Sequence, residues 1–215
     1  IRVIFQTDHD QLLIGSLPSV EQAMSWRTNP DAALVADLAS DSTTGPLIAG
    51  RTPDGAVRGT LKERYFFRRG AGSGWTLVGD AGHHKEFVIG DGITEALLQA
   101  RSLAAAIAQG TDAALIRWWR ARDVEALPFF FLGQDEGALG PPSELQQVVF
   151  ARAAKAPALR ARLAATMEHR LSPTETFPVR HVLWWALGAA LRGSPRVLPQ
   201  FIAKGKRVSA IDREL

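Results

Sequence analysis

One stretch of the sequence combines glycines with an acidic side chain in a pattern typical of ligand binding. Asp80 follows the apolar run Trp75–Val78, and four glycines lie around it or soon after it, at Gly79, Gly82, Gly90 and Gly92. Glycine lets the backbone come close to a ligand, and a carboxylate accepts strong hydrogen bonds. We therefore predict that residues 79–93 bind a polar, electron-rich ligand.

The flanking residues predict the elements that hold this loop. Trp75–Val78 is a short run of strand-forming residues bounded by glycine, which indicates a buried strand. From Ile93 on, apolar residues recur with the spacing of one helical face, at Ala96, Leu97, Ala100, Leu103, Ala104 and Ile107. A helix N-terminus offers free N–H groups and a positive dipole end. We expect a strand, a ligand-binding loop and a helix; an ordinary connection without a ligand is the alternative.

This stretch resembles the second FAD-binding motif of a flavoprotein superfamily. The resemblance is carried by Leu77–Gly82, by Gly90-x-Gly92-Ile93, and by the helix with Ala100 and Leu103–Ala104. The family comprises FAD-dependent monooxygenases of the aromatic-hydroxylase type, with geranylgeranyl-reductase-like and halogenase-like relatives. It implies that Asp80 hydrogen-bonds the ribityl or pyrophosphate part of FAD. The residues implied to bind the cofactor are Gly79, Asp80, Gly82, Gly90, Gly92 and Ile93.

The sequence departs from the family pattern in three ways. Glu86-Phe87 stands where Asp-Pro is usual, and Asp91 stands where Gln is frequent. The family's first motif, G-x-G-x-x-G, is missing. Residues 70–74 imitate it, but they precede a strand, whereas a dinucleotide fingerprint follows a strand and opens a helix, so we predict a turn there. We expect the chain to be part of a longer protein, and by itself to bind FAD weakly or not at all.

The resemblance implies an FAD-dependent oxidoreductase of the monooxygenase type. Such an enzyme would use NAD(P)H and oxygen to oxidise a small organic substrate, with the flavin supplying the difficult chemistry. Within the same superfamily, a reductase or dehydrogenase of a lipid-like substrate and a flavin-dependent halogenase remain open. From another class, a non-enzymatic helical module with a vestigial flavin motif remains open. The sequence assigns neither a substrate nor a catalytic residue.

Composition limits the remaining possibilities. The 215 residues are 46% hydrophobic and contain no cysteine, which excludes disulfides and thiol catalysis and suits a reducing, cytoplasmic compartment. The net charge of +3 is spread without a dense basic run, so we expect no nucleic-acid partner. The apolar run at residues 181–191 is too short to span a membrane. The oligomeric state is not indicated.

The order of elements predicts an α+β fold. It consists of an α/β-type FAD-binding portion with a substrate-domain sheet, followed by a mostly helical C-terminal region. Three parts are expected: substrate-domain strands and helices at residues 1–70, the second FAD-binding motif at 71–110, and the helical region at 111–215. In the first part we predict a hairpin over 1–16, helices over 19–27 and 30–38 capped by Ser19 and Asn29, a loop over 40–55, and strands over 57–67.

The second half predicts helices separated by clear breaks. Thr111 caps a helix that Pro128 should kink or end. The apolar run Phe129–Leu132 belongs to a core, to an interface or to a substrate cavity. Further helices are expected over 143–154, 157–169 and 181–191, and the tail from Lys204 is expected to fray.

Other candidates for chemistry are few. His83 and His84 are adjacent, so their side chains diverge, and no third ligand is evident; we predict no metal site. His84 could handle protons near a flavin or make a simple loop contact. The arginines in residues 64–69 could face an anionic substrate or lie at a solvated strand end.

Overall fold

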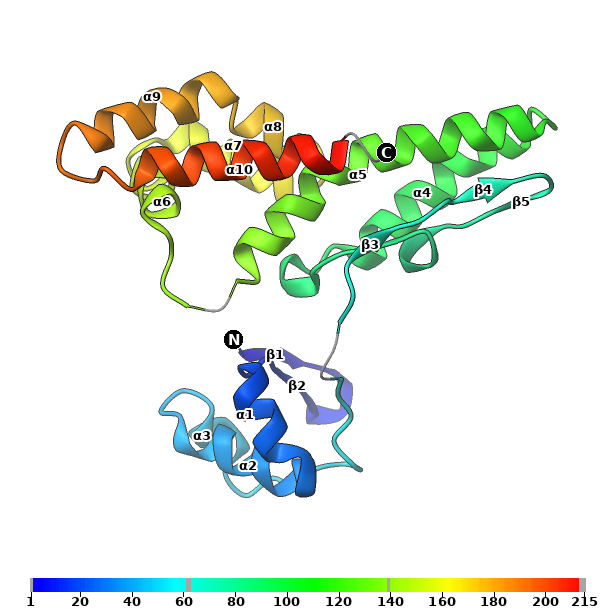
Figure 1. Ribbon diagram of the computed structural model, residues 1–215. Helices are drawn as coiled ribbons and strands as arrows, with labels where there is room; N and C mark the ends of the chain where they lie inside the picture. Colours follow the sequence, from blue (N-terminus) through cyan, green and yellow to red (C-terminus); the bar gives the residue numbers. More distant parts are fainter. Residues whose placement is uncertain (1, 61–62, 139, 213–215) are drawn as a thin grey trace. The chain divides into compact units, whose positions relative to one another are not determined.

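A computed structural model of the chain describes residues 2–60, 63–138 and 140–212 (Figure 1). The chain divides into two compact units, residues 1–63 and 64–215. Helices predominate, and the described strands form small two-stranded antiparallel sheets, which agrees with the predicted α+β class. The predicted boundaries at residues 70 and 110 stay predictions.

The first unit begins with the predicted hairpin. Strands β1 (Arg2–Gln6) and β2 (Leu12–Ser16) pair antiparallel. Helices α1 (Val20–Ser25) and α2 (Pro30–Ser40) follow, and the predicted caps are confirmed. Ser19 Oγ accepts from the N–H of Gln22 at 3.1 Å, and Asn29 Oδ1 accepts from the N–H of Ala32 at 3.2 Å. The loop predicted over 40–55 is wrong in part, because Gly45–Ile48 form the short helix α3.

Arg2 fixes the hairpin of this unit to α2. Its guanidinium lies 2.9 Å from a carboxylate oxygen of Asp37 and 2.8 Å from one of Asp41. Asp41 also accepts from the N–H groups of Thr43 and Thr44, each at 2.9 Å. The hydrogen bonds from these two N–H groups lower the pKa of the Asp41 carboxyl, and Arg2 adds to the effect against a smaller opposing contribution from burial.

The second unit begins with two short strand pairs. Strand β3 (Phe66–Phe67) pairs with β6 (His83–His84), and β4 (Ala71–Gly72) pairs with β5 (Trp75–Thr76). The turn predicted within residues 70–74 is confirmed. The buried strand predicted over Trp75–Val78 is wrong, because β5 has two residues and both Trp75 and Val78 are exposed. Of the strands predicted over 57–67, the described residues form β3; positions 61 and 62 lie outside them.

Two long helices form the centre of this unit. Helix α4 (Gly92–Ile107) packs on α5 (Asp112–Glu136), with Leu103 and Ala106 against Trp118 (Figure 1). The predicted apolar face of α4 is only partly buried: Leu103 is inside, whereas Leu97 and Ile107 are exposed. The polar side chains of Glu95 and Gln99 lie inside instead, because each has a hydrogen-bond partner in the unit.

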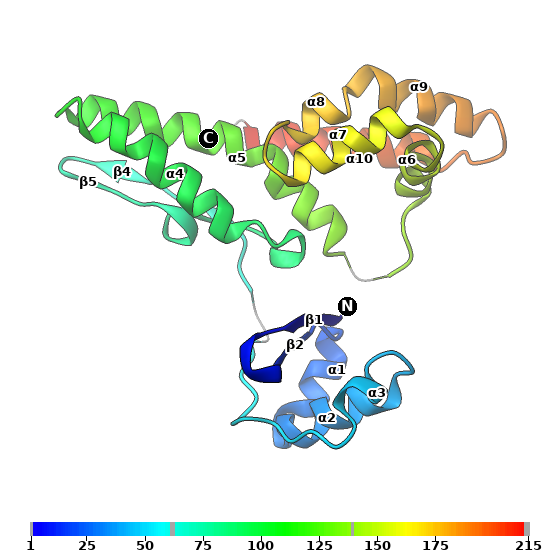
Figure 2. The same ribbon diagram turned by 180° about the vertical axis from the view of Figure 1, so that it is seen from behind.

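Helix α5 continues past Pro128. Thr111 Oγ1 accepts from the N–H of Ala114 at 3.2 Å, as predicted for a cap. Pro128 lies inside the helix, which bends along its length in both views and continues to Glu136 (Figures 1 and 2). Pro128 therefore does not end the helix. Phe129, Phe130 and Phe131 are buried, and Phe130 and Phe131 pack with Leu127, which places this run in a core.

The remaining helices pack around a second core. They are α6 (Glu144–Lys155), α7 (Pro157–Met167), α8 (Pro173–Thr176), α9 (Val179–Ala190) and α10 (Val197–Asp212). Leu145, Ala186, Ala189 and Val197 join α6, α9 and α10. The fraying predicted from Lys204 is wrong, because α10 continues to Asp212 and both Lys204 and Arg207 form ion pairs with Asp135. Among the described helices, none has the length and apolarity needed to cross a membrane.

Candidate functional site

The first predicted site residues lie on a 3-10 turn packed against α4. This turn, η3, spans Gly79–Ala81, and the N–H of Gly79 donates to Oε1 of Gln99 at 2.8 Å. Gly79 has φ +60°, and an added Cβ would lie 3.2 Å from that of Ala96. The position therefore needs glycine both for its backbone conformation and for the close approach of α4. Asp80, the next residue, is exposed to solvent.

Gly82 has a packing role that its sequence context does not show. An added Cβ at Gly82 would lie 2.1 Å from Nη1 of Arg122, a residue of α5. Arg122 is buried, and its Nη1 donates to the carbonyl oxygen of Leu77 at 2.8 Å. Gly82 thus makes room for a buried guanidinium, which accounts for a glycine at this position without any ligand.

The other predicted residues lie at the N-terminus of α4. Gly90, in the left-handed conformation, ends the 3-10 turn η4 (Phe87–Ile89), and Asp91 is the N-cap residue of α4. Gly92 and Ile93 are exposed, and among the described residues no atom of another part of the chain lies within 4 Å of the position that a Cβ at Gly92 would take. The Asp91 side chain makes no capping hydrogen bond to the helix. Within the described residues, the first-turn N–H groups of α4 therefore have no side-chain cap.

The Asp91 carboxylate points instead into a buried cluster of charged side chains. Nζ of Lys85 lies 2.7 Å from Oδ2 of Asp91, and it also forms an ion pair with Glu95, one turn further along α4. All three side chains are at least nine-tenths buried. An ammonium between two carboxylates satisfies charges that would be costly to bury alone.

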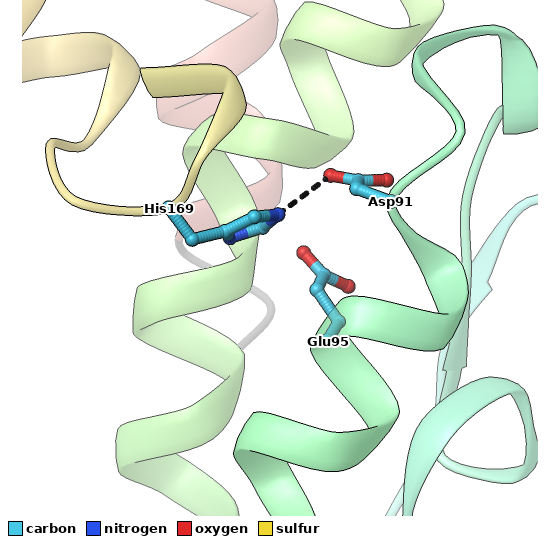
Figure 3. A group of neighbouring side chains, drawn as sticks. All are labelled: Asp91, Glu95 and His169. Atoms are coloured by element: carbon cyan, nitrogen blue, oxygen red, sulfur yellow. Dashed lines mark ion pairs between the residues drawn. The ribbon is translucent and has the colours of Figure 1, made fainter. Parts of the chain in front are cut away.

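Two histidines complete this cluster from opposite sides. Nε2 of His83 lies 3.1 Å from Oε2 of Glu95, and the His83 ring stacks on Phe67. Nε2 of His169 lies 3.2 Å from Oδ2 of Asp91, and its ring stacks on Phe129 with the centroids 4.3 Å apart. Figure 3 shows His169, from the turn after α7, pointing toward Asp91 and Glu95 at the start of α4. We call His83, Lys85, Asp91, Glu95 and His169 the buried charge cluster.

Part of the buried charge cluster has the composition of a metal site. Asp91, Glu95 and His169 each offer a ligand atom, and these atoms lie within 4.8 Å of one another (Figure 3). Carboxylate and imidazole ligands suit divalent transition metals. However, the Lys85 ammonium already contacts both carboxylates and supplies the positive charge that a metal ion would bring. The geometry therefore favours a salt-bridged network over a metal centre.

Burial and ion pairing act in opposite directions on Asp91. Burial alone would raise the pKa of its carboxyl, but the interactions with His169 and Lys85 outweigh it and lower the pKa. Asp91 is thus held as a carboxylate. Its negative charge is directed toward Lys85 and His169 rather than toward the helix N–H groups.

The sequence did not predict this cluster. Asp91 and Glu95 are spaced i, i+4 at the start of a predicted helix, a signal that they share a face. Nothing local identifies His169, which reaches the cluster from a turn far along the chain, with φ +53°. Of the earlier candidates, Nδ1 of His84 lies 2.8 Å from the carbonyl oxygen of Arg64, a loop contact. Arg68 lies over the ring of Phe66, two residues before it.

Comparison of the chain with protein-family models, curated proteins and solved structures found no match. A function for the chain therefore has to be proposed from the chemistry and geometry of its own residues.

Proposed function

We propose that this chain belongs to an FAD-dependent oxidoreductase and supplies the loop and helix N-terminus that bind the flavin. The carrying observation is the open first turn of α4. Asp91 occupies the capping position but turns its carboxylate inward, and Gly92 and Ile93 beside it are exposed. Free N–H groups at the positive end of a helix attract an electron-rich acceptor, such as the pyrimidine edge of a flavin.

The neighbouring residues have roles consistent with this proposal. Gly79 brings η3 against α4, so that exposed Asp80 lies beside the same helix. Its carboxylate would accept hydrogen bonds from ribityl hydroxyls, which a charged acceptor strengthens. The helix dipole would also favour the negative charge that a flavin gains on reduction. The packing of Arg122 already explains the glycine at position 82, so Gly82 gives the least support to flavin binding among the predicted residues.

The finer assignment is part of the same proposal. The flavin-binding portion is of the α/β type and the chain also contributes a substrate-domain sheet. The reaction is of the monooxygenase type in the cytoplasm, with NAD(P)H and oxygen as co-substrates. A flavin supplies the redox chemistry when it is bound, and the chain's residues position it. Oxygen consumption in the presence of NAD(P)H separates a monooxygenase from a reductase of the same superfamily.

Titration with FAD, followed by backbone amide NMR, tests the proposal. Because this sequence lacks the G-x-G-x-x-G fingerprint, the expected affinity is weaker than about 1 µM, as few ADP contacts offset the cost of ordering the ligand. Saturable shifts should centre on Asp80, Gly92 and Ile93. Riboflavin should reproduce the shifts of Gly92 and Ile93, and ADP, the matched control, should not.

Two outcomes would overturn the proposal. The first is the absence of saturable shifts at about 1 mM FAD, since helix N-termini that bind anions weakly should still respond there. The second is a set of shifts that avoids the N-terminus of α4. Submicromolar binding would instead show that the cofactor site lies elsewhere on the chain.

A further inference from the structure

The Asp91 carboxylate could cap the N-terminus of α4, but it points into the buried charge cluster instead. Asp is among the best N-cap residues, because its carboxylate accepts from the N–H groups of the second and third helical positions. In this chain those positions are Ile93 and Thr94. Asp91 nevertheless makes no capping bond, whereas Ser19, Asn29, Thr111 and Ser143 all cap their helices with side chains.

The backbone and the buried charge cluster together explain this exception. Asp91 has φ −97° and ψ 2°, whereas N-cap residues usually have an extended backbone. Its carboxylate faces Nζ of Lys85 at 2.7 Å and Nε2 of His169 at 3.2 Å. Lys85 also pairs with Glu95. Loss of the ammonium would therefore leave two buried carboxylates without the positive charge that they share.

We propose that Lys85 is a positioning residue that holds Asp91 inward and thereby keeps the first-turn N–H groups of α4 free for a ligand. Lys85 is buried and touches no ligand itself; it acts through Asp91. The groups that face Asp91 are Lys85 before η4, Glu95 on α4 and His169 after α7. Only the identification of that ligand as FAD rests on the proposed function.

Each carboxylate of the buried charge cluster has partners on more than one side. The Asp91 and Glu95 carboxylates share one ammonium, and each also faces an imidazole, that of His169 or His83. Removal of Lys85 together with one carboxylate removes one positive and one negative charge, so the net charge of the cluster is unchanged. Such charge-balanced double variants avoid the cost of an unpaired buried ion.

Amide hydrogen exchange of Ile93 and Thr94, measured by NMR without any ligand, tests the proposal. In Lys85→Met/Glu95→Gln, Asp91 loses its ammonium partner and should turn outward to cap α4, slowing exchange of these amides roughly threefold to tenfold relative to the parent. In Lys85→Met/Asp91→Ala the same lysine is missing but no carboxylate can cap, so exchange should stay as fast as in the parent. Equal exchange in the two double variants would overturn the proposal.

A single variant keeps the proposal testable if a double variant does not fold. Asp91→Ala retains the Lys85–Glu95 pair and should leave exchange at Ile93 and Thr94 unchanged, because no capping bond is lost. Thr111→Ala is the matched control: it removes a real cap on α5, so exchange at Ala114 should accelerate. Acceleration of similar size at Thr94 in Asp91→Ala would show that Asp91 caps α4 in solution and would overturn the proposal.

FAD binding adds a second readout that a purely structural lysine would not produce. The released carboxylate competes for the first-turn N–H groups, so Lys85→Met/Glu95→Gln should bind FAD about tenfold more weakly than Lys85→Met/Asp91→Ala. A parent chain that shows no response to FAD would contradict the proposed function. The exchange measurements would then still decide the role of Lys85.

Discussion

The guanidinium of Arg122 lies over Gly82, with Nη1 2.1 Å from the position that a Cβ of residue 82 would take. The same nitrogen donates to the carbonyl oxygen of Leu77 at 2.8 Å, and Nε donates to Oδ1 of Asp123 at 2.9 Å. Arg122 therefore binds α5 to the chain on both sides of η3. The loop that carries Asp80 is therefore held by two helices, α4 through Gln99 and α5 through Arg122.

Replacement of Gly82 by alanine should destabilise the protein even without a ligand. The added methyl group would displace a buried guanidinium, and overpacking of this kind costs about 1–3 kcal/mol. Gly92→Ala is the matched control, because nothing lies within 4 Å of its Cβ position, and it should be within about 0.5 kcal/mol of the parent. Urea unfolding of both variants measures the difference; equal stabilities would contradict the packing role of Gly82.

Replacement of Arg122 by methionine should be more severe. It leaves the buried Asp123 carboxylate without its partner, and breaking a buried ion pair from one side costs about 3–5 kcal/mol. Arg120→Met, at an exposed position of the same helix, should change stability by less than about 0.5 kcal/mol. The additional change Asp123→Leu should restore part of the loss. Thermal and urea unfolding give these values, and a neutral Arg122→Met would show that the pair is not formed.

Replacement of Asp80 by alanine should weaken FAD binding and leave the apo protein unchanged. Asp80 is exposed, so its removal costs little packing, whereas a charge-assisted hydrogen bond to FAD is worth roughly 1.5–3 kcal/mol, or about tenfold to a hundredfold in affinity. The apo melting temperatures of parent and variant should agree, and the rise induced by FAD should shrink in the variant. Equal rises would remove Asp80 from the site.

Replacement of Asp91 by asparagine should make the free energy of unfolding depend less on pH in acid. The pKa of this carboxyl is lowered from 3.8 on folding, so its contribution to stability is complete above about pH 5 and is lost as the pH falls through the lower folded value. The free energy of unfolding of the parent should therefore fall more steeply between about pH 5 and pH 2 than that of Asp91→Asn. Urea unfolding across this range measures both slopes, and parallel slopes would contradict the ion pairing of Asp91.

Local signals in the sequence were sufficient for much of the secondary structure. Ser19, Asn29 and Thr111 each precede a helix that they cap, because a capping side chain bonds N–H groups only two or three residues away. The hairpin over residues 1–16 follows from alternation and a turn, which are equally local. The sequence does not distinguish between a kink and a helix end at Pro128, because packing of the following phenylalanines decides between them.

The burial of the candidate site depended on the tertiary structure. The spacing of α4 favoured Leu97 and Ile107 as inward residues, but Glu95 and Gln99 lie inside, since Lys85, His83 and the N–H of Gly79 satisfy them there. A polar side chain can be buried only where partners converge on it. The partners of Asp91 are Lys85, nearby in the sequence, and His169, whose position is set by the packing of α7 against α8 and of α8 against α5. The sequence therefore determined which residues could bind a ligand, and long-range pairing of charges decided which of them face outward.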